Sequence, residues 1–133
     1  MSNLFDTNAC IHLMKLHEPL TARARAAGPS TISITAITLA EMWFGAAKSN
    51  QPRRTRSDQD AFLAPFRALD FDAVAVDCYA SIRAHLTAKV RPIGDRDLMI
   101  AAIARANRLV VVTSNVGEFA RVPELKVEDW MVL

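Results

Sequence analysis

The sequence is poor in the residues that cross-link or loosen a polypeptide. Its 133 residues include only two cysteines and four glycines. Cys10 and Cys78 are far apart and form no Cys-x-x-Cys pair, which excludes a disulfide framework and the common cysteine metal motifs. We therefore expect two buried, reduced thiols in a cytoplasmic protein.

Long apolar runs are also missing. No stretch approaches the roughly 18 consecutive apolar residues that a membrane-spanning helix needs, so we expect no membrane partner. Met1-Ser2-Asn3 leads directly into a predicted strand, and we expect no targeting segment.

The remaining composition is that of a globular protein. Half of the residues (51%) are hydrophobic, which together with the length predicts a single domain over residues 1–133. The net charge of +2 is mild, but arginines cluster locally at Arg53, Arg54 and Arg56. Such a cluster is either a solvated surface or a phosphate-binding patch.

Short β-branched or apolar runs alternate with helical patterns along the chain. The predicted strands are Leu4–Phe5, Thr31–Ile34, Phe71–Val76 and Leu109–Val112, with an edge strand and tail over Lys126–Leu133. Ser49–Arg56 is interpreted as a mobile loop and Asp58–Ala68 as a helix. The alternation predicts an α/β fold: a three-layer α/β/α sandwich with a mainly parallel, twisted sheet.

A helix from Thr35 to about Lys48 carries a carboxylate inside its apolar stripe. Ile37, Ala40, Glu41 and Phe44 have the spacing of one helix face, with Thr35 as N-cap. A carboxylate on a buried face is costly unless a positive group meets it, so Glu41 is a candidate site residue.

Polar residues also follow two predicted strands. Asp6 follows the first and Asn115 the fourth, while Asp97 lies in the first turn of a helix predicted over Asp95–Asn107. If the first and fourth strands are parallel neighbours, these groups meet at the carboxyl edge of the sheet, where open α/β sheets bind ligands. Oxygen ligands alone favour Mg²⁺ or Mn²⁺, which suits chemistry on phosphates.

Each of these residues also has a purely structural interpretation. Asp6 or Asp95 can be a helix N-cap, Asp97 can complement a helix dipole, and Asn115 can be a turn residue. Three further groups, Thr7, Thr113 and Ser114, either orient a catalytic water or satisfy strand-end backbone groups. Two arginines that flank the expected cleft, Arg91 and Arg96, either contact phosphate or are ordinary surface residues.

Five segments together resemble the PIN-domain ribonucleases. They are Leu-Phe-Asp-Thr-Asn at 4–8, Leu-Ala-Glu-Met-Trp-Phe-Gly-Ala at 39–46, Ile-Gly-Asp-Arg-Asp-Leu-Met-Ile-Ala-Ala at 93–102, Val-Thr-Ser-Asn-Val-Gly-Glu-Phe at 112–119 and Arg-Val-Pro-Glu-Leu-Lys-Val-Glu-Asp-Trp at 121–130. The last segment is similar to the ending of the bacterial VapC toxins. The resemblance covers nearly the whole chain, in order.

This resemblance implies a metal-dependent endoribonuclease, the toxin of a VapBC-type system. Asp6, Glu41 and Asp97 match the acidic catalytic site, with Asp6 and Asp97 as metal ligands. Asn115 matches a fourth site residue that is often Asp. Supporting positions are matched by Thr7, Thr113 and Glu118, and Asp95 is a further supporting candidate. The candidates for contact with the RNA backbone are Arg53, Arg54, Arg56, Arg91 and Arg96.

The resemblance also implies partners. These are an RNA substrate, a VapB-type antitoxin and a second copy of the chain in a homodimer, with DNA contacted only through the antitoxin. Trp43 and Phe44 are candidates for antitoxin contact, and core packing is the other interpretation of Trp43.

Two other function classes remain open. Asp6 after a strand also suits the nucleophile of a phosphatase or phosphotransferase, although Asp6-Thr7-Asn8 lacks the second aspartate of the common Asp-x-Asp form. The main alternative is a degenerate, non-catalytic PIN module that binds RNA or a partner, which Asn115 in place of an acid favours. Failure to bind Mn²⁺ separates this alternative from a nuclease.

Overall fold

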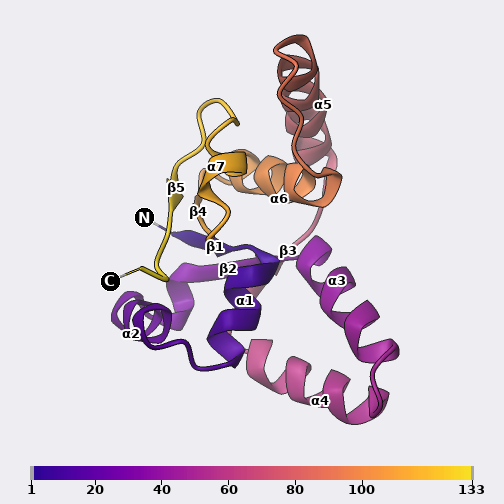
Figure 1. Ribbon diagram of the computed structural model, residues 1–133, viewed down its shortest axis with the longest axis vertical. Helices are drawn as coiled ribbons and strands as arrows, with labels where there is room; N and C mark the ends of the chain where they lie inside the picture. Colours follow the sequence, from indigo (N-terminus) through magenta and orange to yellow (C-terminus); the bar gives the residue numbers. More distant parts are fainter. Residues whose placement is uncertain (1, 133) are drawn as a thin grey trace.

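A five-stranded parallel sheet runs through the computed structural model, which describes residues 2–132 (Figure 1). The strands are β1 (Asn3–Phe5), β2 (Ile32–Thr35), β3 (Arg67–Leu69), β4 (Val110–Val112) and β5 (Val127–Glu128). Their spatial order is β3-β2-β1-β4-β5, and all four neighbouring pairs are parallel. The predicted adjacency of the first and fourth strands is confirmed, with Phe5 opposite Val112.

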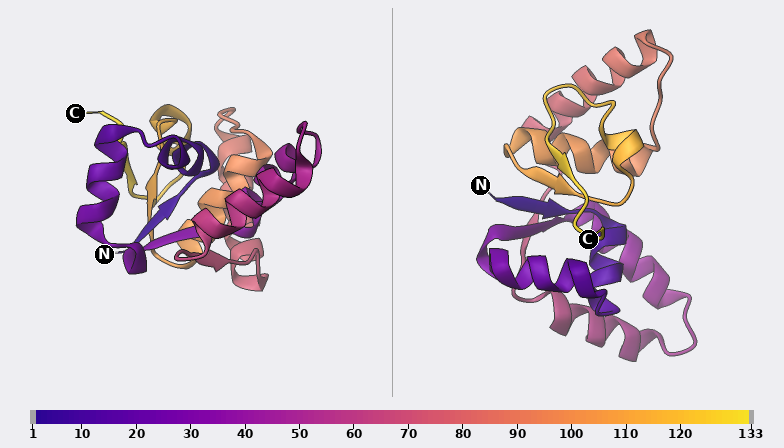
Figure 2. Two further views of the ribbon diagram at one scale, coloured as in Figure 1. Left: turned by 90° about the horizontal axis from the view of Figure 1, so that it is seen from below. Right: turned by 60° about the vertical axis from the view of Figure 1, so that its left-hand side comes forward.

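Helices cover both faces of this sheet. They are α1 (Thr7–Met14), α2 (Glu18–Ala27), α3 (Ala36–Ala47), α4 (Pro52–Leu63), α5 (Ala73–Ala88), α6 (Asp95–Ala106) and α7 (Val116–Phe119), with a 3₁₀ turn at Pro29–Thr31. In Figure 1, α5, α6 and α7 lie above the sheet and α1, α2 and α4 below it, and Figure 2 shows the same layers from two other sides. The predicted three-layer α/β/α fold is confirmed.

Each face of the sheet has its own apolar core, because successive strand residues point to opposite faces. Leu4 packs with Ile100 and Ile103 of α6 in one core, and Phe5 packs with residues of α1 and α2 in the other. Trp130 belongs to the second core and meets the Phe5 ring edge to face, with the ring centroids 5.5 Å apart. The C-terminal segment is thus held against β1 through this aromatic pair.

Two segment predictions are wrong. Ser49–Arg56 is not a loop, because α4 begins at Pro52. The helix predicted over Asp58–Ala68 is part of α4 and ends at Leu63. Phe71–Val76 is not a strand: β3 lies earlier, at Arg67–Leu69, and the Asp72 side chain caps α5 by accepting a hydrogen bond from the Ala75 N–H at 3.0 Å. The predicted edge strand is short, at Val127–Glu128, and Leu133 lies outside the described residues.

The apolar stripe predicted for α3 is also wrong. The buried residues of this helix are Thr38, Met42 and Ala46, whereas Phe44 is 63% exposed. Thr35 is the N-cap as predicted, and its side chain accepts a hydrogen bond from the Thr38 N–H at 3.1 Å. Glu41 therefore lies beside the buried face of α3 rather than within it.

Two further expectations concern burial. Cys10 is buried as expected, but Cys78 is only half-buried. Within residues 2–132, no helix combines the length and the apolar character that crossing a membrane requires.

Candidate active site

Asp6 stands at the carboxyl end of β1 and is almost completely buried, with 3% of its surface exposed. Its Oδ1 accepts a hydrogen bond from the Ala9 N–H at 2.8 Å, which caps α1. Its Oδ2 accepts a hydrogen bond from Thr113 Oγ1 at 2.5 Å. The N-cap interpretation and the site interpretation of Asp6 are therefore compatible, because the same carboxylate caps α1 and lines the cavity described below.

Thr113 and Asn115 follow β4 and organise the adjacent turn. The Thr113 hydroxyl, which donates to Asp6, accepts a hydrogen bond from the Asn115 N–H at 2.9 Å. Asn115 Nδ2 lies 2.6 Å from Glu118 Oε2 and 3.4 Å from Asp97 Oδ2, donating to both. One amide thus holds the acidic groups of α6 and α7 beside each other.

Glu41 reaches the same region from α3. Thr7 Oγ1 donates a hydrogen bond to Glu41 Oε1 at 2.7 Å, and the Arg96 guanidinium lies 3.9 Å from Glu41 Oε2. The Glu41 side chain is 26% exposed and that of Arg96 is 69% exposed, so their ion pair is weakened by solvent.

Sequence reasoning missed the residue that steadies Thr7. Thr38 is fully buried, and its hydroxyl lies 3.0 Å from Thr7 Oγ1 and 3.5 Å from Thr35 Oγ1. These hydroxyls link the start of α3 to the start of α1. The sequence signal for this contact was that Thr38 carries a hydroxyl three residues after the N-cap Thr35, and the structure buries that side chain.

The three predicted acids line one cavity of 520 Å³. Asp6, Glu41 and Asp97 share its wall with Thr7, Asn8, Ile11, Gly94, Asp95 and Arg96. It lies at the carboxyl edge of the sheet, as the strand-end argument predicted.

Burial and mutual repulsion disfavour the charged forms of these acids. Burial raises the pKa of Asp97 from 3.8 to about 6, helped by the hydrogen bond that the protonated Asp97 carboxyl donates to Glu118 and by the charges of Asp6, Glu118 and Glu41. Burial also raises the pKa of Asp6, although its hydrogen bonds from Thr113 and Ala9 oppose the increase. A divalent cation held in the cavity would offset this penalty, because it would favour the ionised carboxylates.

The donor set fits a hard divalent cation with few protein ligands. Among residues 2–132, no three Asp, Glu, His or Cys side chains are gathered tightly enough to form a ready-made three-ligand site. Mg²⁺ is commonly held by one or two carboxylates while keeping several waters, so a loose pair of acids with raised pKa suits it. The oxygen-only chemistry of this cavity does not suit zinc.

Asp95 does not have its predicted capping role. Gly94 is the N-cap of α6, and Asp95 instead accepts a hydrogen bond from the Tyr79 hydroxyl at 2.5 Å. Its side chain remains on the cavity wall.

The predicted arginines separate into two groups. Arg96 lines the cavity, whereas Arg91 is exposed and lies outside its lining. The other three are on α4: Arg53 and Arg54 are exposed, and Arg56 stacks 3.6 Å from the Trp43 ring and pairs with Asp60 at 3.1 Å. Trp43 is 37% exposed and is therefore not an ordinary core residue.

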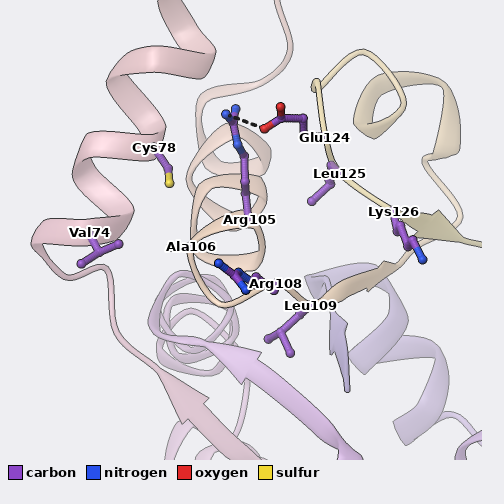
Figure 3. A pocket seen from close by; sticks show the side chains of 9 residues that line it. All are labelled: Val74, Cys78, Arg105, Ala106, Arg108, Leu109, Glu124, Leu125 and Lys126. Atoms are coloured by element: carbon purple, nitrogen blue, oxygen red, sulfur yellow. Dashed lines mark hydrogen bonds and ion pairs between the residues drawn. The ribbon is translucent and has the colours of Figure 1, made fainter. Parts of the chain in front are cut away.

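A second large cavity, of 470 Å³, lies at the other end of α6, between that helix, α5 and the segment before β5 (Figure 3). Its lining contains Arg105, Arg108 and Lys126 but only one acid, Glu124, which pairs with Arg105 at 3.1 Å. With α6 rising about 1.5 Å per residue, this cavity is roughly 17 Å from the acids at the helix start. It shares no residue with the acidic cavity.

The chain is similar over nearly its whole length to known proteins. The model of the protein family described as "PIN domain" matches residues 4–125. The chain is 40% identical to the tRNA(fMet)-specific endonuclease VapC of Salmonella typhimurium and 39% identical to that of Shigella flexneri, each over 96% of both chains. It also superposes on VapBC2 from Rickettsia felis, solved bound to a DNA fragment from its promoter, with a TM-score of 0.90, 34% identity and coverage of 98% and 99% of the two chains.

Proposed function

The chain belongs to the PIN-domain family, in its VapC ribonuclease branch, and we propose that it cleaves RNA in the 520 Å³ cavity lined by Asp6, Glu41 and Asp97. It is an RNA-cleaving hydrolase and the toxin component of a VapBC toxin–antitoxin system. The observation that carries the proposed site is the convergence of three acids from different elements on one cavity, with the pKa of Asp97 raised to about 6.

A divalent cation, Mg²⁺ or Mn²⁺, is the cofactor that this donor set supports. Asp6 and Asp97 would hold it, because both carboxylates line the cavity. Thr113 fixes one of these carboxylates and Asn115 the other, through neutral hydrogen bonds that leave their negative charge in place. When bound, the cation polarises a phosphoryl oxygen and makes a water more acidic.

The remaining residues have roles that follow from their contacts. Glu41 is oriented by Thr7 and receives the proton of the attacking water as general base. Arg96, mostly exposed at the cavity wall, contacts a phosphate of the substrate. Glu118 acts through Asn115, which it shares with Asp97, as a positioning residue.

Transfer RNA is the substrate class to test first, with tRNA(fMet) as the leading candidate. The support is the 39–40% identity to two VapC proteins that are named for this substrate, over 96% of their length. The exposed arginines of α4, Arg53 and Arg54, extend the basic surface available to an RNA backbone.

The proposed partners are a VapB-type antitoxin and a second copy of the chain. Related structures were solved as VapBC complexes on DNA, which supports an antitoxin that connects the toxin to its promoter. On this chain the exposed Phe44 and the half-exposed Trp43 lie on α3, near Glu41, and offer apolar contact to the antitoxin. The antitoxin, rather than this chain, contacts the DNA.

Cleavage of purified RNA tests the catalytic proposal. The antitoxin-free protein is incubated with total bacterial RNA and with tRNA(fMet), with and without Mg²⁺ or Mn²⁺. We expect metal-dependent, discrete cleavage that Asp6→Asn and Asp97→Asn abolish and that Asp77→Asn, on the exposed side of α5, retains. If folded, metal-supplied wild-type protein leaves every RNA intact, the non-catalytic binding module becomes the better description.

A further inference from the structure

A small cavity adjoins the proposed catalytic cavity and shares Asp95 with it. It has a volume of 230 Å³, and its apolar wall includes Leu86, Ile93 and Leu98. Arg83 of α5, an exposed residue, also lines it. At about 30 Å³ per water molecule, the cavity offers the room of roughly eight waters, which is comparable to the ring and substituent atoms of one pyrimidine base.

Arg83 is held beside this cavity by hydrogen bonds. Arg83 Nη1 donates to the Tyr79 hydroxyl at 2.9 Å, and that hydroxyl donates to Asp95 Oδ1 at 2.5 Å. The Tyr79 ring is in turn fixed edge to face against Phe71, with centroids 5.8 Å apart. The position of all three polar groups is therefore set before any ligand arrives.

These contacts tie α5 to the start of α6, but they leave binding capacity unused. Among residues 2–132, no carboxylate lies within ion-pair distance of Arg83, so most of its five N–H donors remain available. Within the same part of the chain, Asp95 Oδ2 has no hydrogen-bond donor. A fixed cation and a fixed acceptor thus flank an apolar cavity.

We propose that this 230 Å³ cavity is a nucleotide subsite next to the scissile phosphate. The base enters against Leu86, Ile93 and Leu98, and a phosphate adjacent to that base binds Arg83. The subsite rests on the proposed RNA cleavage, because only a strand crossing the wall at Asp95 occupies both cavities at once.

Asp95 makes the subsite selective. Its carboxylate accepts hydrogen bonds and donates none, so it favours a base with an exocyclic amino group at its pairing edge. Cytosine, adenine and guanine have such a group and uracil has not. The hydrogen bond to Asp95 raises the pKa of Tyr79, which keeps the Tyr79 hydroxyl protonated as the donor to this carboxylate.

The contribution of Arg83 is tested by Arg83→Gln with Arg108→Gln as the matched control. Arg108 is also exposed, but it lines the cavity at the other end of α6 (Figure 3). On an RNA containing the mapped cleavage site, we expect Arg83→Gln to raise KM about five- to twentyfold with little change in kcat, and to lower the salt slope of binding by about one. The control should stay within about twofold of wild type, and equal behaviour of the two variants overturns the proposal.

The selectivity is tested by varying the two nucleotides that flank the cleaved bond. At one of these two positions, wild type should cleave the RNA that carries uracil about tenfold less efficiently than the RNAs that carry cytosine, adenine or guanine. A tenfold difference lies within the range of about 1–3 kcal/mol that one base contact contributes to discrimination. Asp95→Asn, which can both donate and accept, should reduce this preference to below about threefold. A preference that Asp95→Asn leaves unchanged contradicts the assignment.

Binding measurements separate this inference from the proposed function. If wild type cleaves no RNA, the proposed catalysis fails, but fluorescence anisotropy with the same labelled RNAs and the Asp97→Asn protein still reports the subsite. Weaker binding by Arg83→Gln than by Arg108→Gln in that background supports it, and equal binding refutes it. Melting curves of each variant exclude loss of fold as the cause.

Discussion

Replacing Asp97 with asparagine should stabilise the metal-free protein at neutral pH. The folded-state pKa of Asp97 is raised from 3.8 to about 6, so folding must place an unfavourable charge near Asp6, Glu41 and Glu118. A pKa two units above its ordinary value corresponds to at most about 3 kcal/mol, at about 1.4 kcal/mol per unit. Asp97 is half-buried, and screening by solvent reduces the expected gain to about 1–1.5 kcal/mol.

The pH dependence of this gain follows from proton linkage. Between about pH 4 and pH 6 the folded protein binds more protons at Asp97 than the unfolded chain, so its stability falls as the pH rises through this window. Asparagine carries no charge at any pH. The Asp97→Asn protein should therefore be more stable than wild type at about pH 7.5 and equally stable at about pH 4.

The assay is thermal unfolding in EDTA at both pH values. A gain of about 1–1.5 kcal/mol should raise the melting temperature of a chain of this size by about 3–6 °C at neutral pH. Asp77→Asn, an exposed acid of α5, is the control and should change little. A melting temperature below that of wild type at neutral pH, or an equal gain at both pH values, would refute the argument.

Four further outcomes are expected from the same geometry. Thr113→Val removes the hydroxyl that donates a hydrogen bond to Asp6 and accepts one from the Asn115 N–H. In urea unfolding it should lower the free energy of unfolding by about 1–3 kcal/mol, and Thr113→Ser should recover most of the loss. Mg²⁺ should raise the melting temperature of wild type at neutral pH and should release protons in calorimetry at about pH 6, where Asp97 is partly protonated, and Asp97→Asn should lose both effects. Phe44→Ser should weaken antitoxin binding at least about tenfold without lowering the melting temperature, because the ring is 63% exposed. Neutralising Arg53 and Arg54 together should lower the salt slope of RNA binding by up to about two, and an unchanged slope would remove them from the interface.

The position of the acids was predictable from the sequence because it depends on local patterns. Strand ends are marked by the change from apolar to polar residues at Asp6 and Thr113, and parallel neighbours bring those ends to one edge. Asp97 follows from the helix start after Pro92 and Gly94. Only the adjacency of β1 and β4, a contact between distant segments, had to be assumed.

The start of α4 was missed because that helix has almost no apolar face. Only Gln59 and Leu63 are buried along its twelve residues, so hydrophobic spacing did not reveal its first turns. Pro52 was interpreted as a loop residue, although proline is favoured in the first turn of a helix. The charge of Arg53 and Arg54 added to the false impression of a solvated loop.

The false strand at Phe71–Val76 has a different cause. Val74 and Val76 alternate with small residues as in a strand, but they are 60% and 46% exposed on the first turns of α5. The Asp72 cap decides for the helix, because it satisfies the free Ala75 N–H that a helix start otherwise leaves exposed.

Side-chain contacts between distant segments could not be predicted from the sequence. Thr7 and Thr38 are 31 positions apart, and their hydroxyl contact depends on how α1 packs on α3. The Glu41 carboxylate was expected to meet a positive group, yet its close partner is the neutral hydroxyl of Thr7, and Arg96 is further away at 3.9 Å.

The choice of neutral partners explains why the proposed site costs folding stability. Thr113, Thr7 and Asn115 orient the acids through hydroxyl and amide donors, none of which supplies a full positive charge. Lysine or arginine at these positions would lower the pKa values of the acids and stabilise the fold. It would also neutralise the negative charge that a divalent cation needs in order to bind. Neutral donors fix the geometry and leave the repulsion among the acids for the cation to relieve. The same arrangement makes Asp97 the residue whose neutralisation should raise stability while it removes activity.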